Sequence, residues 1–357
     1  MRTGSSIAAL MLASALAAGS TGATMAQSRP ASGETAELAR SADDWPDCRG
    51  RAIGMYPLCR VVPKAFPDIT DVSHSSLRTA NTITGFFEAK SRHKAAQMVA
   101  FFAPRPDPVV YLEAGLGFAW ESQDALLEVW SGDAFANGPP EALSYPLRIV
   151  GGDGSAIVEF VNTPELLGRE YRFIASITFD DDGNIIRWAD YWDGRASKSN
   201  VPYGALGPYP ADFRDDVENS SKLIRRITGK LHRALRKGDA AAAAAMFSPD
   251  GVLEDVPLHA RIVGRIQIGR YFERALPLLP YARRAAMGHV SGGDFGGGYE
   301  WIPRATANNP LKRGITLVEL DDQHRITRMT TMYDAYKLSE ARYHNLFLAA
   351  AEDPAQN

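Results

Sequence analysis

The sequence predicts an α+β protein built from two copies of one domain. Residues 185–193 and 326–334 share a strand-like pattern 141 positions apart, with Ile, Arg and a final Asp in matching places. The same offset aligns 111–113 with 252–254. In each half, helical patterns come first and mostly antiparallel strand patterns follow, which is an α+β plan. Self-similarity at a fixed interval indicates a duplicated domain.

The chain is long enough for two hydrophobic cores. It has 357 residues, of which 45% are hydrophobic and 23% charged, and domains of about 100–150 residues are the commonest size. The formal net charge is −3 at pH 7. Because nucleic-acid-binding domains are usually basic, the composition argues against a nucleic-acid partner.

Residues 1–26 have the pattern of a secretory signal peptide. Arg2 supplies a positive charge, an apolar run covers 7–18, and small residues surround a cleavage position after Ala26. The alternative is an N-terminal membrane anchor, but the run is shorter than the roughly 20 residues that cross a bilayer. We therefore expect a periplasmic or secreted protein with no integral membrane segment after processing.

Residues 27–76 are expected to form a leader and a disulfide-looped arm. Cys48 and Cys59 are the two cysteines of the chain, and in an oxidising compartment such a pair favours a disulfide. A zinc site would need a second pair of ligands, and a redox motif has the shorter Cys-x-x-Cys spacing. The seven histidines show no paired metal-ligand spacing. We expect neither a metal nor another cofactor.

Domain one is expected over residues 77–195 and begins with helices. Apolar residues three and four apart predict an amphipathic helix from about residue 77, and a second helix covers 95–102. A β-rich segment at 109–113 precedes a helix over 122–130, for which Ser122 is a suitable N-cap. Four strands are expected to follow, at 147–150, 156–162, 171–179 and 185–193.

Domain two is expected over residues 217–348, after a linker at 196–216 that is rich in Gly and Pro. Its first helix is capped near residues 219–220 and ends at Gly238, the residue type favoured after a helix C-terminus. The glycine-rich segment 292–298 is interpreted as a flexible hairpin loop, since a phosphate-binding loop opens a helix instead. The other expected elements are an Ala-rich helix at 240–245, a helix at 266–276, and strands at 251–256, 286–290, 298–302, 313–320 and 325–333.

This plan and the repeated strand end together resemble the nuclear transport factor 2-like superfamily, over about 77–195 and 219–345. Members include ketosteroid isomerases, limonene epoxide hydrolase and the SnoaL-like polyketide cyclases. The resemblance implies two tandem curved antiparallel sheets, each a cone with a pocket and wrapped by N-terminal helices. Since duplication places two like sheets on one chain, we expect an intrachain pseudo-dimer. A homodimer with a second chain is the alternative.

The strand end of the first copy resembles the epoxide hydrolase branch. Trp188-Ala189-Asp190-Tyr191-Trp192-Asp193 places Asp190 where that branch has its water-activating Asp. The branch's Tyr-x-Asn segment falls on Tyr111-Leu112-Glu113, with Glu113 in place of Asn. Its second Asp falls on Asn162, which cannot protonate an epoxide oxygen. The resemblance therefore does not carry epoxide hydrolysis over to this chain directly.

The residues themselves favour acid–base chemistry at Asp190. Alternation along the strand places Trp188, Asp190 and Trp192 on one face. Burial among aromatic side chains raises a carboxyl pKa and suits general acid–base catalysis near neutral pH. The predicted roles are Asp190 as base or water activator, Glu113 as the complementary acid, Tyr111 and Asn162 as hydrogen-bonding groups that orient substrate, and Phe160, Trp188 and Trp192 as walls. The alternative is a structural Asp190 that bonds a loop or Tyr111.

Domain two is expected to be a degenerate copy. Thr331 occupies the position of Asp190, and the segment 252–255 resembles the part of ketosteroid isomerases that carries the proton-shuttling Asp. The Tyr expected on the first helix of that branch falls on Leu231. Asp255 and Glu254 remain minor candidates for chemistry. Asp193 and Asp334 end the same strand in both copies, which favours turn or cap roles.

The resulting hypothesis is an exported, cofactor-independent hydrolase, lyase or isomerase. It would hydrate or open an epoxide, dehydrate, isomerise or cyclise a small apolar molecule of polyketide- or terpenoid-like chemistry. The alternative is a non-catalytic periplasmic ligand-binding or assembly protein, because a fold by itself does not imply an activity.

Overall fold

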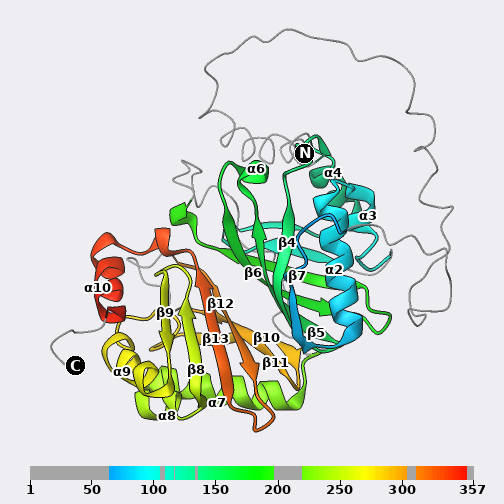
Figure 1. Cartoon of the computed structure of the whole chain (residues 1–357). Helices are drawn as coiled ribbons and strands as arrows, with labels where there is room; N and C mark the ends of the chain where they lie inside the picture. Colours follow the sequence, from blue (N-terminus) through cyan, green and yellow to red (C-terminus); the bar gives the residue numbers. More distant parts are fainter. Residues whose placement is uncertain are drawn as a thin grey trace, which may run out of the picture.

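The computed structural model describes residues 64–104, 109–115, 117–132, 136–196, 219–303 and 311–351. The predicted signal peptide, Cys48, Cys59 and the linker from residue 197 onward lie outside these ranges. The described residues form two units, each with one sheet and helices on its outer face (Figure 1). No helix within these ranges is long and apolar enough to cross a bilayer.

The first unit contains one sheet, four α-helices and one 3-10 turn among the described residues. Its strands lie in the order β1-β4-β5-β6-β7-β2-β3. Its elements are β1 (Asp71–Ser75), α2 (Leu77–Ser91), α3 (Ala95–Val99), β2 (Val110–Glu113), β3 (Phe118–Trp120), α4 (Gln123–Trp130), β4 (Ser144–Gly151), β5 (Ser155–Asn162), α6 (Pro164–Leu167), β6 (Tyr171–Phe179), β7 (Ile185–Trp192) and a 3-10 turn (Gly194–Ala196).

The second unit repeats this arrangement. Its strand order β10-β11-β12-β13-β8-β9 matches β4-β5-β6-β7-β2-β3 strand for strand. The match extends the repeat seen in the sequence to every paired strand except β1. Its elements are α7 (Lys222–Lys237), α8 (Ala240–Ala244), β8 (Phe247–Asp255), β9 (Ala260–Val263), α9 (Arg265–Ala275), β10 (Ala286–Gly293), β11 (Gly296–Ile302), β12 (Gly314–Leu320), β13 (Ile326–Tyr333), a 3-10 turn (Ala335–Lys337) and α10 (Glu340–Ala350).

Both sheets are mixed, which corrects the expectation of antiparallel sheets. The β2–β7 and β8–β13 pairs are parallel, as is the β1–β4 pair at one edge. After β2 the chain forms β3 and α4 and then adds the antiparallel strands β4, β5, β6 and β7 to the same sheet, and β7 closes against β2 in the parallel direction. Parallel pairing of this kind needs a long connection, which the helices and intervening strands supply.

The helix ends follow local side-chain chemistry. Ser122 caps α4 as predicted, with its hydroxyl accepting from Ala125 N at 3.1 Å. The cap of α7 is Ser221, one residue beyond the expected position, and its hydroxyl accepts from Ile224 N at 3.1 Å. Gly238 ends α7 with φ of 75°, a left-handed conformation that glycine adopts without a steric penalty.

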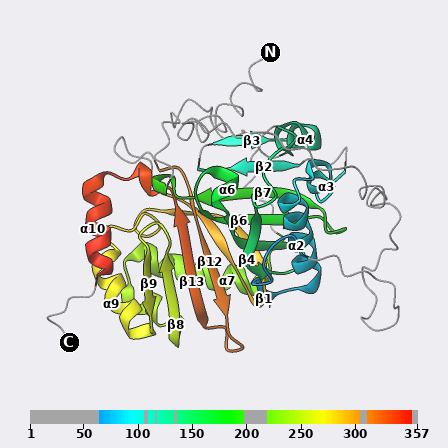
Figure 2. The same cartoon turned by 45° about the horizontal axis from the view of Figure 1, so that its top comes forward.

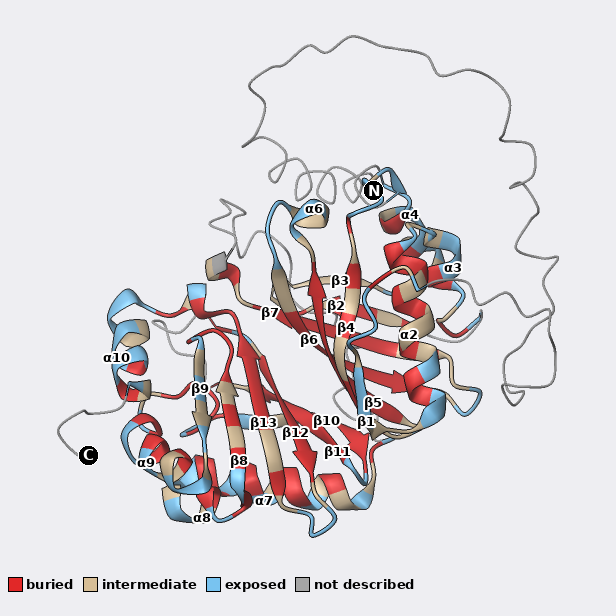
Figure 3. Cartoon of the chain, viewed as in Figure 1, coloured by how far each residue is buried: buried red, intermediate tan, exposed pale blue. Residues whose placement is uncertain are grey.

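The two sheets pack against each other through the faces that the helices leave uncovered (Figure 1 and Figure 2). Buried residues concentrate between the sheets and beneath the helices, as Figure 3 shows. Removal of such apolar faces from water is the main favourable term in association. The apolar residues between the sheets are Leu112, Ala114, Val150, Ile157, Ile174, Ala189 and Tyr191 from the first unit and Val256, Ile315, Leu317 and Met332 from the second.

The glycine-rich segment lies within paired strands and brings the sheets close together. Gly292 and Gly293 end β10, and Gly296 begins β11, so the expected loop is mostly strand. A Cβ on Gly293 would stand 2.8 Å from Gly152 N of the first unit. A Cβ on Gly298 would stand 2.6 Å from Ile157 Cδ1. Glycine is required here because any side chain would push the two units apart.

Candidate active site

Strand β7 carries the central residues of the predicted site. It pairs with β6 on one side and β2 on the other, and its side chains alternate between the two faces of the sheet. Trp188 packs on the helix side against Phe86 of α2, with ring centroids 4.8 Å apart. Arg187 points to the second unit and pairs with Glu300 of β11. Asp190 therefore lies on the helix side, inside the first unit.

Asp190 is buried and held by two neutral donors. Its side chain belongs to a residue only 4% exposed. The Tyr111 hydroxyl donates to Asp190 Oδ2, and the Trp188 indole N–H donates to Asp190 Oδ1. Burial raises the pKa of Asp190 to about 6, against the lowering effects of Lys90 and of these two hydrogen bonds. The carboxyl thus titrates near neutral pH, which suits an exchange of protons.

Aromatic side chains surround this carboxyl. Tyr111 stacks on Trp188 with ring centroids 5.8 Å apart and 12° between the planes. Trp130 approaches Tyr111 at 5.5 Å and Phe102 approaches it at 6.4 Å. All of them belong to the apolar cluster inside the first unit. Burial, followed by the charge of Asp190, raises the pKa of Tyr111 well above its usual value, so this hydroxyl stays protonated and able to donate.

Lys90 of α2 is a functional candidate that sequence reasoning missed. The residue is 8% exposed. Its Nζ lies 5.0 Å from the ring centre of Phe160 and 5.6 Å from that of Phe87. Burial lowers the pKa of Lys90 to about 8, against the attraction of Asp190. An acid and a base with pKa values shifted toward each other therefore share one apolar interior.

Asn162 and Phe160 lie near Lys90, as residues of β5. Asn162 is buried, and its Oδ1 accepts a long hydrogen bond of 3.5 Å from Lys90 Nζ. Phe160 is fully buried and stacks on Phe173 at 4.8 Å. The predicted wall position of Phe160 is therefore occupied by an aromatic stack, and Asn162 faces the lysine amine.

Glu113 and Asp190 occupy neighbouring register positions on the parallel strands β2 and β7. Their carboxylates nevertheless bind different partners. Glu113 Oε1 accepts from the Trp192 indole N–H and, at 3.3 Å, from Gly115 N. A different tryptophan of β7 thus donates to each carboxylate, Trp188 to Asp190 and Trp192 to Glu113. The structure brings the predicted acid and base to one face without a direct bond between them.

Trp192 lies at the edge of the aromatic interior of the first unit, beside the half-buried Tyr171; this edge is called the rim. Its ring packs edge-on against Tyr171 at 5.4 Å and lies 6.1 Å from Phe173. Tyr171 is half-buried, whereas Trp192 is 9% exposed. A line of rings therefore runs from Phe160 near Lys90 through Phe173 to this rim.

In the second unit, the pairing of β8 with β13 differs by one residue from the register that the sequence predicted. Glu113 pairs with Asp190, whereas Thr331, the counterpart of Asp190, pairs with Asp255. The spatial counterpart of Glu113 is therefore Asp255, not Glu254. The alignment of 111–113 with 252–254 was one residue out of step for this strand, and a shift of one residue moves every side chain to the opposite face.

Asp255 is fully buried inside the second unit. Its carboxylate accepts from Leu258 N and from the Tyr281 hydroxyl, each at 3.3 Å, and from the Tyr333 hydroxyl at 3.5 Å. Burial raises the pKa of Asp255 to about 7, against the lowering effect of these hydrogen bonds. The second unit thus holds a carboxyl with a raised pKa. It has no counterpart of the Asp190 carboxyl, because Thr331 stands at that position, and the Thr331 hydroxyl donates to Ile315 O at 3.1 Å.

Glu254 points out of the second unit toward the first. It pairs with Arg172 of β6 at 2.7 Å and with Arg328 of β13 at 3.3 Å. Burial alone raises the pKa of Glu254, but the bonds and charge of Arg172 outweigh it and lower that pKa. Its position fits a contact between the units and lies on the far face of the sheet from Asp255.

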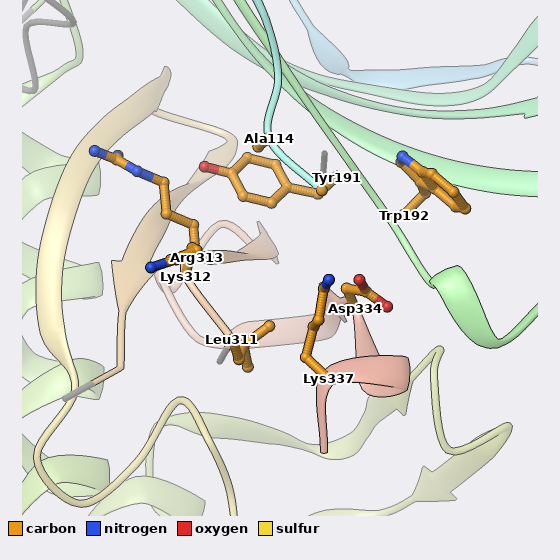
Figure 4. A pocket seen from close by; sticks show the side chains of 9 residues that line it. Ala114, Tyr191, Trp192, Leu311, Lys312, Arg313, Asp334 and Lys337 are labelled. Carbon is orange, nitrogen blue, oxygen red and sulfur yellow. The ribbon is translucent and has the colours of Figure 1, made fainter. Parts of the chain in front are cut away.

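A pocket at the junction of the units lies beside the end of β7. In Figure 4, Tyr191 and Trp192 lie on opposite sides of their strand, and Lys337 stands beside Asp334. Positively charged side chains from the second unit form much of the wall. The lining residues are Ala114, Gly115, Tyr191 and Trp192 from the first unit and Leu311, Lys312, Arg313, Asp334 and Lys337 from the second.

No group of three His, Cys, Asp or Glu side chains within the described ranges is arranged to hold a metal ion. The donors around Asp190 are a phenol, an indole and an amine, none of which is a usual ligand for a hard cation.

Known proteins match this chain only as solved structures of low sequence identity. No protein-family model and no curated protein matches the sequence. A Silicibacter pomeroyi protein with a cystatin-like fold matches at 12% identity and a TM-score of 0.30, covering 36% of this chain and 85% of its own. A steroid delta-isomerase from Pseudomonas aeruginosa matches at 16% identity and a TM-score of 0.28, covering 36% and 90%.

A SnoaL-like protein from Burkholderia thailandensis matches at 12% identity and a TM-score of 0.28, covering 32% of this chain and 97% of its own. The names of these structures, cystatin-like, steroid delta-isomerase and SnoaL-like, are of the kind that the sequence resembles. At such identities and TM-scores they carry no argument about activity. The function of this chain is therefore inferred from its own side chains.

Proposed function

We propose that this chain is a cofactor-independent enzyme that performs acid–base chemistry on a small, largely apolar organic molecule. The observation that carries the proposal is the setting of Asp190, a carboxyl with a pKa of about 6 that is 4% exposed and enclosed by aromatic rings. Perturbed carboxyls of this kind are enriched at catalytic sites.

The proposed chemistry moves a proton between substrate and Asp190. The carboxylate takes a proton from a C–H bond next to a carbonyl, or from a water that attacks the substrate. The oxygen that gains negative charge accepts a hydrogen bond from the Tyr111 hydroxyl or a proton from the Lys90 ammonium. Both donors act from an apolar interior, where electrostatic stabilisation of a developing charge is strongest. Isomerisation, hydration or epoxide opening, dehydration and cyclisation all use these steps.

The other predicted residues have supporting roles in this proposal. Glu113 is the second carboxyl at the rim, kept in position by Trp192. Asn162 orients substrate beside Lys90, and Phe160 and Trp188 contribute apolar wall. These roles are supported by the placement of all five side chains in or beside the interior of the first unit.

A non-catalytic ligand-binding or assembly protein is the second candidate. The observation that favours it is that both oxygens of Asp190 already accept hydrogen bonds, as expected for a satisfied structural carboxylate. Under this alternative the aromatic interior holds a ligand without changing it. Export to the periplasm or cell exterior is part of both proposals and is supported by the signal-like pattern of residues 1–26.

Matched variants of the two copies test the proposed function. Wild type, Asp190→Asn and the control Thr331→Ser are incubated in D2O with a panel of small ketones, enones and epoxides, and products and deuterium incorporation are followed by NMR. We expect turnover by wild type and by Thr331→Ser and a loss of about 10²–10⁴-fold in Asp190→Asn, the usual contribution of a general base.

Two outcomes would contradict the proposed function. Equal turnover by wild type and Asp190→Asn would remove Asp190 from the mechanism. Stoichiometric binding of a panel member in native mass spectra, without product from any variant, would favour the binding protein.

A further inference from the structure

Lys90 occupies the buried face of its helix. In α2, Ile83, Phe86, Phe87 and Lys90 follow the spacing of a single helical face, and all four are buried. The first three contribute to the apolar cluster of the unit. A lysine at the end of such a stripe carries its amine into the aromatic interior instead of toward water. Buried lysines are rare unless they are paired or functional.

The surroundings of the amine do not form a conventional salt bridge. Within the described ranges, Nζ contacts the rings of Phe87 and Phe160 and the neutral amide of Asn162 at 3.5 Å. Asp190 acts on it through space from β7, and its own oxygens are held by Tyr111 and Trp188. The site therefore stabilises the ammonium only weakly. Burial lowers the pKa of Lys90 to about 8, so a substantial fraction is a neutral amine in mildly alkaline solution.

A neutral, desolvated lysine amine is a nucleophile toward carbonyl carbon. We propose that Lys90 forms an imine with a small ketone or aldehyde substrate, and that Asp190 moves the protons of that reaction. This inference deepens the proposed function, on which it rests, by naming carbonyl compounds as the substrate class. It is carried by the position of the amine over two ring faces and beside the Asn162 amide, in the same aromatic interior that holds Asp190.

The proposed steps balance in atoms and electrons. The amine lone pair bonds to the carbonyl carbon, the C=O π pair moves to oxygen, and a proton passes from nitrogen to that oxygen. The protonated carboxyl of Asp190 then donates to the hydroxyl, the C–O bond breaks, and water leaves an iminium ion. The Asp190 carboxylate next removes a proton from the adjacent carbon. The C–H pair becomes a C=C bond, and the C=N π pair returns to nitrogen as an enamine.

The remaining steps release the product without an oxidant or reductant. Asp190 returns its proton to a carbon of the enamine, which can differ from the carbon that lost one. Water then adds to the iminium carbon and gives one proton to the Asp190 carboxylate. The proton of the new hydroxyl passes to nitrogen as the C=O bond re-forms and the C–N bond breaks, which restores the free amine of Lys90 and the protonated carboxyl. Isomerisation and hydrogen exchange next to a carbonyl are the reactions that this cycle supports.

Borohydride trapping tests the proposal on the whole protein. Borohydride delivers hydride to an iminium carbon and fixes the adduct, so the protein gains the mass of the probe less one oxygen atom. Cyclohexanone and benzaldehyde are suitable probes because they are small and apolar. Lys90 is only 8% exposed, so the aromatic rings around it must move apart to admit a ligand. Intact mass gives the stoichiometry, and peptide mapping gives the modified lysine.

The expected result is a single adduct on Lys90, with a yield that rises with pH around a midpoint of about 8. Burial lowers the pKa of Lys90 that sets this midpoint, and the charge of Asp190 on β7, which accepts from the Tyr111 hydroxyl of β2, raises it. Lys90→Arg should give no adduct. Lys94→Arg is the matched control, because Lys94 is exposed just beyond the end of α2, and it should label as wild type does.

The outcomes separate this inference from the proposed function. An adduct spread over exposed lysines, or none at Lys90 in the wild-type peptide map, overturns the imine. The peptide map of the wild-type protein decides this point even if Lys90→Arg fails to fold. If Lys90→Arg keeps deuterium exchange while Asp190→Asn loses it, the imine is wrong and the proposed function stands. If Lys90 is labelled but Asp190→Asn exchanges hydrogen as fast as wild type, the imine stands and the role of Asp190 is wrong.

Discussion

Asp193 and Asp334 each bind the backbone that follows the other. Asp193 Oδ1 accepts from Ala335 N at 3.0 Å, and Asp334 Oδ1 accepts from Gly194 N at 2.9 Å. These residues directly follow β7 and β13, so the repeated Asp joins the two copies at equivalent points. The sequence predicted turn or cap roles for these two residues. In the structure each carboxylate also accepts from a backbone N–H of the other unit.

This exchange predicts a pH-dependent stability. Burial raises the pKa of Asp193 to about 6 and, together with the charge of Asp193, that of Asp334 to about 7. The unfolded value is about 3.9. Because the folded pKa values are raised, the stabilisation is fully present below about pH 4 and is lost as pH rises through 6 to 7.

Asp334→Asn keeps an oxygen for Gly194 N and removes one titration, so it should flatten this decline in the free energy of unfolding. Urea unfolding at pH 4.5, 6 and 8 measures it. A slope equal to that of wild type between pH 6 and pH 8 would contradict the assignment.

The buried ion pair between the units predicts a large loss of stability on truncation. Arg187 binds Glu300 through two nitrogens at 2.6 and 3.0 Å, and the Tyr191 hydroxyl donates to Glu300 at 2.7 Å. Burial alone would raise the pKa of Glu300, but the charge and bonds of Arg187 outweigh it and lower that pKa to about 2. Glu300→Gln leaves a buried cation without its partner and should cost about 3–5 kcal/mol in urea unfolding.

An exposed pair supplies the control for this variant. Arg195 and Glu340 also join the two units, at 3.1 Å, but the Glu340 side chain is 84% exposed. Solvent screens such pairs, so Glu340→Gln should leave the unfolding midpoint almost unchanged. Similar losses in both variants would show that burial does not set the energy of these contacts.

The sequence predicted the plan of the fold because its signals are local. The Ser122 cap, the Gly238 helix end and the alternating pattern of β7 depend on neighbours in the chain. The environment of Asp190 was also predictable, because residues two apart on a strand share a face. Trp188 and Asp190 confirm this by bonding directly.

The missed features depend on tertiary contacts. A lysine within a helical pattern is usually assigned to the polar edge of the stripe, although its position three residues after Phe87 could have identified Lys90 as buried. The register of β8 was misjudged because Leu-Glu occurs at 112–113 and at 253–254 while the strand pairing places Asp255 opposite Thr331. The bond between Glu113 and Trp192 could not be predicted, since it depends on how two side chains from different strands turn toward each other.

Removal of the Lys90 charge should shift the titration of Asp190. The charge of Lys90 lowers the pKa of Asp190, which burial has raised to about 6. In Lys90→Met that attraction is gone, so the midpoint should move to higher pH, whereas Lys90→Arg should keep it near the wild-type value. NMR of protein labelled with 13C at Asp carboxyls measures the midpoint without a substrate, and Asp190→Asn identifies the resonance. A lower midpoint in Lys90→Met would contradict the pairing.

The packing of the two units predicts a monomer in solution. The sheet faces that would otherwise be exposed cover each other within one chain, through an apolar layer and the Arg187–Glu300 pair. A second chain would have to displace this contact to pack against either of these sheet faces. Light scattering after size-exclusion chromatography should give the mass of one chain across a wide range of concentrations. A stable dimer mass would favour the homodimer alternative.

The register shift supplies a matched pair of variants, one in each copy. Glu113 and Asp255 occupy equivalent positions beside Asp190 and Thr331. Glu113→Gln should lower turnover, by about 10²-fold if Glu113 is the complementary acid. Asp255→Asn should leave turnover unchanged, because Thr331 offers no second carboxyl in that copy.

The stability of Asp255→Asn distinguishes a dispensable copy from a second active site. Burial raises the pKa of Asp255 to about 7, so the ionised form destabilises the fold and its cost grows as pH rises through 7. The Asn side chain keeps an acceptor for Leu258 N and carries no charge. Asp255→Asn should therefore be more stable than wild type at pH 8 and close to it at pH 5, by urea unfolding. Lost turnover together with this gain in stability would instead place chemistry in the second unit, because a carboxyl kept at a cost to stability needs a function to retain it.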